Sequence, residues 1–156
     1  MRKLILPILA VALAAITLTS LSPASAHPKN HAFTVTTKTI DETPVDKTKP
    51  PKLGDTSVIT EDVYVGGKKI GTSDLTCTLV RLDLTQRFFA AECFNTTVLP
   101  GGQIAAQGYV TSDQIEKVPF KQAITGGTGA YIGAKGELTV DEAGDGPAHL
   151  TFALVR

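Results

Sequence analysis

The residues best suited to chemistry in this chain are a few polar side chains that interrupt stretches of alternating apolar residues. Side chains alternate between the two faces of a strand, so polar residues in phase with the apolar ones are expected to face the interior. The residues in such positions are Thr37, Thr39, Glu61, Arg81, Asn95 and Gln122. An apolar cavity with a few polar groups is typical of a small-molecule site. We therefore interpret these six residues, together with Phe89 and Phe120, as candidate ligand-binding residues.

Glu61 is the candidate catalytic residue of this set. Burial in an apolar lumen disfavours a charged carboxylate and raises its pKa, which suits a general acid or base. The alternative is that Glu61 pairs with Arg81 at a barrel rim and has no chemical role. The sequence leaves both interpretations open.

The two cysteines, Cys77 and Cys93, are predicted to form a disulfide. Their midpoint falls in a predicted turn at residues 83–86, so a hairpin centred there places them opposite each other. Opposed residues of this kind are close enough to be bridged. A reactive thiol or a metal ligand is the alternative, but neither cysteine has a histidine at ligand spacing. We predict no metal site and no cofactor.

Short alternating segments between turn residues must position these side chains. No segment has a convincing helical period, and we predict eight strands. They span residues 31–40, 56–65, 71–82, 87–98, 103–111, 118–125, 136–141 and 149–155. Residues 41–52 carry three prolines and are predicted to form a loop. Strands at short, regular spacing are typical of a barrel or a sandwich.

The same alternation predicts an apolar lumen. If Lys38, Asp62, Lys121 and Glu137 face water, the opposite face of the strands is largely aliphatic and aromatic. The inward set is Phe33, Val35, Ile59, Val63, Leu75, Leu79, Phe89, Ile104, Phe120, Ile124, Leu138, Val140, Leu150, Phe152 and Leu154. A small apolar molecule is therefore the expected ligand.

The first 26 residues resemble an export signal. Arg2 and Lys3 precede an uncharged apolar run over residues 4–21, and Ala24-Ser25-Ala26 matches the pattern that signal peptidase accepts. We predict domains at residues 1–26 (signal peptide), 27–52 (first strand and proline-rich loop) and 53–156 (remainder of one barrel). The mature chain then begins at His27, is secreted, and has no membrane segment. A copper site at an amino-terminal His27 is an alternative, with only His31 and His149 as further histidines.

The composition gives no sign of a nucleic-acid or membrane partner. The chain has 15 basic and 15 acidic residues and no tryptophan. Nothing in this balance indicates a nucleic-acid partner or an anionic membrane.

Glycines gather between residues 124 and 136. The segment lacks the Gly-Lys-Ser/Thr ending of a phosphate loop and leads into an alternating strand, so we interpret it as a bent barrel corner.

The glycine-rich segment reads Ile124-Thr125-Gly126-Gly127-Thr128-Gly129-Ala130-Tyr131, then Gly133-Ala134-Lys135-Gly136. This stretch resembles the signature of allene oxide cyclases and, more loosely, of dirigent proteins. Features in the same order are Leu53-Gly54-Asp55, Val63-Tyr64-Val65-Gly66, Ile70-Gly71, Cys77 and Gln107-Gly108. The resemblance covers residues 33–141 and implies an eight-stranded antiparallel closed barrel with an apolar lumen, often trimeric.

The catalytic set of the plant cyclases is poorly matched. The resemblance implies a carboxylate near Thr37, asparagines near Thr39 and at Glu61, and a cysteine at Cys77. At three of these four positions the implied residue type is absent, and a bridged Cys77 cannot act as a thiolate. Dirigent proteins have an acidic pair near the second strand, of which Glu61 alone remains. Authentic allene oxide cyclase activity is therefore not expected.

The sequence leaves three functions open. The first is a dirigent-like barrel that binds a small apolar molecule and steers its chemistry without a full catalytic set. The second is an isomerase or cyclase acting on an epoxide or polyene, and the third is a ligand-free structural or interaction module.

A homo-oligomer is also expected, because the predicted hairpin leaves an apolar stripe on its outer face. The stripe would pair Val80 with Ala90 and Leu82 with Phe88, and would continue through Phe94 and Val98. The resemblance favours a trimer.

Overall fold

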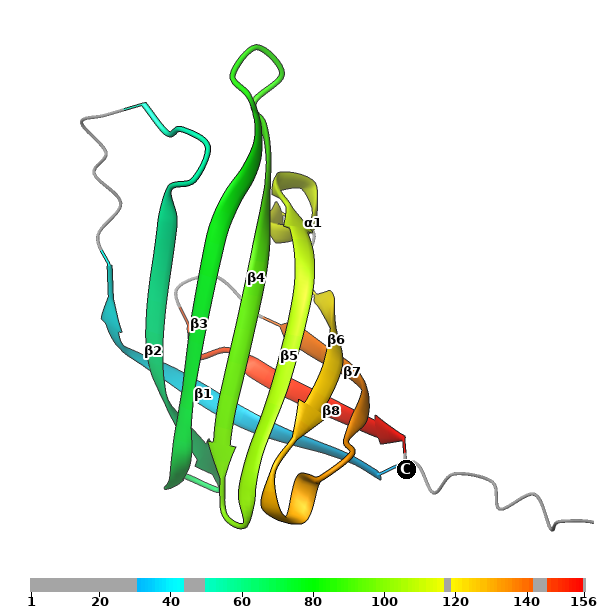
Figure 1. Cartoon of the computed structure of the whole chain (residues 1–156). Coiled ribbons are helices and arrows are strands. Elements are labelled where there is room, and N and C mark those ends of the chain that lie inside the picture. Colours follow the sequence, from blue (N-terminus) through cyan, green and yellow to red (C-terminus); the bar gives the residue numbers. More distant parts are fainter. Residues whose placement is uncertain (1–30, 44–49, 117–118, 142–145, 156) are drawn as a thin grey trace, which may run out of the picture.

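The computed structural model describes residues 31–43, 50–116, 119–141 and 146–155. Eight antiparallel strands close into one barrel in the order β1-β2-β3-β4-β5-β6-β7-β8, which confirms the predicted fold (Figure 1). The strands are β1 (His31–Glu42), β2 (Thr56–Val65), β3 (Lys68–Asp83), β4 (Phe88–Leu99), β5 (Gly102–Thr111), β6 (Phe120–Gly127), β7 (Lys135–Asp141) and β8 (His149–Val155). The predicted signal peptide and His27 lie outside the described residues.

The wall of the barrel is much taller on one side than on the other. Strand β3 has 16 residues and β4 has 12, whereas β6 has 8 and β7 and β8 have 7 each. We call the end that carries the connections after β1, β3, β5 and β7 the upper end, and the opposite end the lower end. Strands β2 to β5 rise above β6 to β8 at the upper end (Figure 1). Among the described strands, β6 to β8 do not reach the height of the upper inner faces of β2 to β5 (Figure 1).

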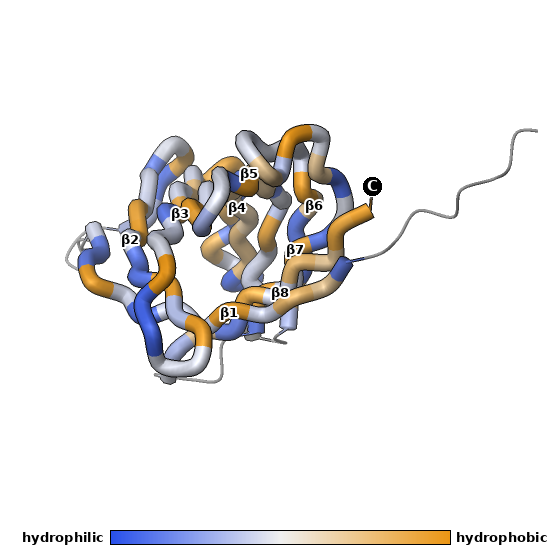
Figure 2. The backbone as a smooth tube through the Cα atoms, turned by 90° about the horizontal axis from the view of Figure 1, so that it is seen from below, coloured by the Kyte–Doolittle hydropathy of each residue, from blue (hydrophilic) through white to orange (hydrophobic). Residues whose placement is uncertain are grey.

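Apolar side chains pack the lower half of the lumen. Val63, Ile104, Leu138 and Phe152 are fully buried, and the ring of Phe152 stacks on that of Phe33 at a centroid distance of 5.0 Å. From below, apolar and polar residues alternate along the ring of strands, as the sequence predicts (Figure 2). Burial of these inward apolar side chains supplies the main driving force for folding.

The glycine-rich segment closes the lower end. It forms the end of β6, a 3₁₀ turn η1 (Gly129–Tyr131) and the approach to β7. Backbone of this segment packs directly on the turn between β4 and β5, where Ala130 N–H donates to Gly101 O at 2.8 Å. A Cβ atom at Gly129, whose φ is +59°, would overlap the carbonyl oxygen of Gly101. The structure thus confirms the barrel-corner interpretation.

Two irregularities shift the strand register near the upper end. One lies between Thr39 and Asp41 in β1, and the other lies between Leu79 and Arg81 in β3. An extra residue in one strand of a pair reverses the alternation beyond it. The predicted pairing of Val80 with Ala90 is therefore wrong, because Arg81 occupies that place. Likewise Asp83, not Leu82, lies opposite Phe88.

One short helix accompanies the eight strands of the all-β barrel, and the sequence interpretation did not include it. Helix α1 (Ser112–Glu116) follows β5 and contacts β4 and β5. Five residues are too few to show a helical period. The available signal is the capping box, since Gln114 Oε1 accepts from Thr111 N–H at 2.9 Å and Thr111 Oγ1 accepts from Gln114 N–H at 3.4 Å.

Candidate functional site

A disulfide spans the inner face of the β3–β4 hairpin, as predicted. Cys77 lies directly opposite Cys93, with their Cα atoms 4.1 Å apart, and the two sulfurs are bonded. The side chain of Cys93 is buried. Neither sulfur is available as a thiolate, so the cysteine of the plant cyclases has no functional counterpart here.

Below the disulfide, buried polar groups cross the lumen at mid-height. Glu61 in β2 is 7% exposed and accepts a hydrogen bond from Thr37 Oγ1 at 2.8 Å. Thr37, in β1, is fully buried. Hydrogen bonding of this kind is what allows a carboxyl group to be held inside a barrel.

A second buried network lies beside the first. Asn95 Nδ2 donates to Ser73 Oγ at 3.0 Å, and Thr97 Oγ1 donates to Asn95 Oδ1 at 2.9 Å. Ser73 and Thr97 are fully buried, and Ser73 lies opposite both Glu61 and Thr97 in the sheet. Our sequence interpretation missed Ser73 and Thr97, although both are in phase with Leu75 and Asn95. We call Thr37, Glu61, Ser73, Asn95, Thr97 and Gln122 the polar floor.

Gln122, in β6, completes the polar floor. Its side chain is 3% exposed, and Oε1 is buried without a hydrogen-bond partner among the described residues. The sequence prediction that it faces inward agrees with this burial.

Apolar side chains stand above the polar floor and remain partly exposed. On β2, β3 and β6, the residues two positions above Glu61, Ser73 and Gln122 are Ile59, Leu75 and Phe120. All three are half-buried, as are Leu79 and Phe89 nearer the upper end. The same alternation that fills the lower half thus leaves an incompletely covered apolar wall where β6 to β8 are too short to face it.

Two predicted site residues are not enclosed. Thr39 and Arg81 are both exposed at the upper end of the barrel. The prediction that Arg81 faces inward with Leu75 and Leu79 is wrong because of the register shift before it. Arg81 forms no ion pair with Glu61 in the described part of the chain, so the alternative in which they neutralise each other is also wrong.

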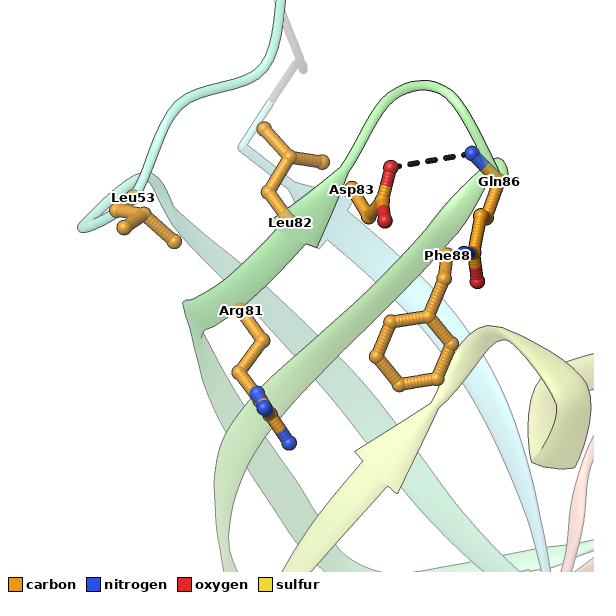
Figure 3. Close-up of a pocket in the computed structure, with 6 residues that line it drawn as sticks. All are labelled: Leu53, Arg81, Leu82, Asp83, Gln86 and Phe88. Atoms are coloured by element: carbon orange, nitrogen blue, oxygen red, sulfur yellow. Dashed lines mark hydrogen bonds between the residues drawn. The ribbon is translucent and has the colours of Figure 1, made fainter.

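An open pocket of about 570 Å³ lies at the upper end beside the β3–β4 hairpin (Figure 3). Leu53 comes from the connection before β2, and the remaining lining residues come from the hairpin. They are Arg81, Leu82, Asp83, Gln86 and Phe88. Asp83 Oδ1 accepts from Gln86 N–H at 3.1 Å and from Thr85 N–H at 2.9 Å, which holds the turn. The pocket therefore combines apolar side chains with the guanidinium of Arg81, which forms no ion pair with any described residue.

Within the described ranges, no group of three or more His, Cys, Asp and Glu side chains is arranged to hold a metal ion. No helix in that part of the chain is long and apolar enough to cross a membrane.

Residues 31–148 match the allene oxide cyclase barrel-like domain family, and the chain belongs to this family. No curated protein matches the chain. Among solved structures, it is similar to a pyocyanin demethylase, with 28% identity and a TM-score of 0.69 over 80% of this chain and 99% of the other. It also resembles the exo-specific intermolecular Diels-Alderase AbnU, with 13% identity and a TM-score of 0.63 over 81% and 98% of the two chains. A pterocarpan synthase dirigent protein matches with 18% identity and a TM-score of 0.57 over 90% and 97%. The last two likenesses show the fold alone.

Proposed function

We propose that this protein is an exported barrel that binds a small apolar molecule in the upper half of its lumen and steers the chemistry of that molecule. The observation that most directly supports this proposal is the polar floor beneath a partly exposed apolar wall. Such a surface removes apolar area from water on binding while a few polar groups orient the ligand. Export rests on residues 1–26 and their small-residue cleavage pattern.

The similar structures support ligand binding of this general kind. Their names describe a demethylase, a Diels-Alderase and a pterocarpan synthase, which all act on small organic molecules. Of these, the demethylase shares most sequence with this chain, and its barrel is covered almost completely. Two features favour steering of the ligand over catalysis by the cyclase residues. Thr37 and Thr39 replace the cyclase residue types, and Cys77 is bridged.

The alternative is an isomerase or cyclase in which Glu61 transfers a proton. Its carboxyl group is buried in the polar floor, and a hydrogen bond from Thr37 orients it. General acid–base catalysis needs a group so positioned.

Substitution of Glu61 by glutamine separates these functions. The amide oxygen introduced by Glu61→Gln can still accept a hydrogen bond from Thr37, but the amide cannot serve as a general acid or base. We expect this variant to bind the neutral fluorescent probe N-phenyl-1-naphthylamine at one site per chain, within about twofold of the unsubstituted affinity. Fluorescence titration measures this, and Glu92→Gln, on the outer face of β4, is the matched control.

Turnover is assayed on the same proteins with an unsaturated fatty-acid epoxide and a conjugated polyene. Conversion by the unsubstituted protein that falls about a hundredfold or more in Glu61→Gln would support the enzyme instead. Failure of every variant to bind the probe would leave the structural module as the function.

We also propose that the barrel assembles as a homotrimer through the outer face of β3, β4 and β5. Apolar side chains exposed there are Val80, Phe94, Val98 and Tyr109. Phe94 is 57% exposed at the centre of this face. Glu92 and Thr96 interrupt this exposed apolar set on the same face of β4. Exposed apolar side chains gathered on an outer sheet face favour burial against another copy.

Replacement of Phe94 by glutamate is expected to dissociate the oligomer while the barrel stays folded, because a charge would be buried in the contact. Light scattering at micromolar concentration gives the mass, and circular dichroism reports the fold. Ile132→Glu, at another exposed apolar residue, should leave the oligomer intact. A monomeric mass for the unsubstituted protein would contradict the assembly.

A further inference from the structure

The open pocket beside the β3–β4 hairpin contains a guanidinium group that no described carboxylate neutralises (Figure 3). Arg81 forms neither an ion pair nor a side-chain hydrogen bond with the described residues. Arg87, which lies between the lining residues Gln86 and Phe88, has no ion pair with them either. Asp83 is the only carboxylate among the described lining residues, and two backbone N–H groups of the turn already bind its Oδ1. Positive charge therefore exceeds negative charge here, which favours an anionic ligand.

The strand register places this guanidinium outside the lumen. The register shift before Arg81 pairs it with Ala90, and Asp83 lies opposite Phe88. Along β4, Phe88 and Ala90 are in phase with the exposed Phe94. Arg81, Asp83 and Phe88 therefore share the outer face of the hairpin. Figure 3 shows the Arg81 side chain and the Phe88 ring extending in the same direction from their strands. A ligand held between them would not occupy the space above the polar floor.

We propose that this pocket is a second binding site, separate from the lumen, for a carboxylate of single negative charge on an aromatic or aliphatic body. The planar fork of a guanidinium matches the two oxygens of a carboxylate. Leu53, Leu82 and Phe88 supply apolar surface beside it, and a volume of about 570 Å³ accommodates a two-ring molecule. The carboxylate of Asp83 disfavours a ligand with two negative charges, such as a phosphate monoester.

Isothermal titration calorimetry with 2-naphthoate tests this site, and 2-naphthamide, a neutral molecule of the same shape, controls for the charge. Both are titrated into protein whose lumen is saturated with N-phenyl-1-naphthylamine. We expect 2-naphthoate to bind at one site per chain, about tenfold more tightly than 2-naphthamide. Arg81→Gln should make the two affinities equal within about twofold. Lys68→Gln, which removes an exposed positive charge at the opposite end of β3, should retain the preference.

The fluorescence of N-phenyl-1-naphthylamine distinguishes the pocket from the lumen. Its displacement by 2-naphthoate would place the carboxylate in the lumen and overturn the second site. Absence of 2-naphthoate binding, equal affinities for the two molecules, or a preference retained in Arg81→Gln would also overturn it. If N-phenyl-1-naphthylamine does not bind, the proposed lumen site fails, and the same titrations without it still test the pocket.

Circular dichroism and light scattering check that Arg81→Gln keeps the fold and the mass of the unsubstituted protein. Arg81→Lys serves the same comparison if the glutamine variant does not fold. Lysine retains the charge but lacks the planar fork, so a preference for 2-naphthoate reduced about threefold is expected. An undiminished preference in this variant would overturn recognition by the guanidinium fork.

Discussion

A chain in which Cys77 and Cys93 are both replaced by alanine is expected to lose about 3 kcal/mol of its free energy of unfolding. The bridge joins residues 16 apart in sequence, so it removes loop-closure entropy from the unfolded chain. The loss corresponds to a fall in melting temperature of about 10 °C. Urea unfolding and thermal unfolding, both followed by circular dichroism, measure the two quantities.

Reduction provides the matched control for this prediction. A thiol reductant should lower the stability of the unsubstituted protein toward that of the double variant and leave the double variant unchanged. Equal stability of both proteins in the absence of reductant would contradict a stabilising role for the bridge.

Most of the barrel could be predicted from the alternation of residue types. The last strand, residues 149–155, begins and ends as expected, and the pairing of Cys77 with Cys93 follows from the position of their turn. Inward burial of Glu61, Asn95 and Gln122 follows from the same alternation. These features depend on local periodicity, which a single sequence contains.

The register shift in β3 and the exposure of Thr39 could not be predicted, because they depend on contacts between residues far apart in the sequence. The register shift before Arg81 depends on how β3 pairs with β4 over many residues, and no residue type marks it. Thr39 is in phase with Thr37 but exposed, because burial near the upper end depends on the lengths of strands on the far side of the barrel. Ser73 and Thr97 were within reach of the alternation argument, yet small hydroxyl side chains also occupy the outer faces of these strands, so their type alone does not distinguish them.

A substitution in the packed lower half of the lumen is expected to have the second large effect on stability. Phe152→Ala is expected to lower the free energy of unfolding by about 3–5 kcal/mol. Phe152 is fully buried, lies between Phe33 and Leu138 in the sheet, and stacks on the Phe33 ring. Its removal leaves a cavity that strands held on both sides by hydrogen bonds close poorly. Urea unfolding measures the loss, and Phe152→Leu, which retains most of the volume, should cost about 1 kcal/mol.

The same variant tests where the ligand lies. If binding uses the upper half of the lumen, a cavity beside Phe33 and Leu138 leaves the site unaltered. The affinity of Phe152→Ala for 2-naphthol, measured well below its melting temperature, should then stay within about twofold of the unsubstituted value. An affinity that rises with the new cavity would place the probe in the lower half, since an apolar cavity of this kind binds aromatic molecules. That result would contradict a site above the polar floor even if the stability loss were as large as expected.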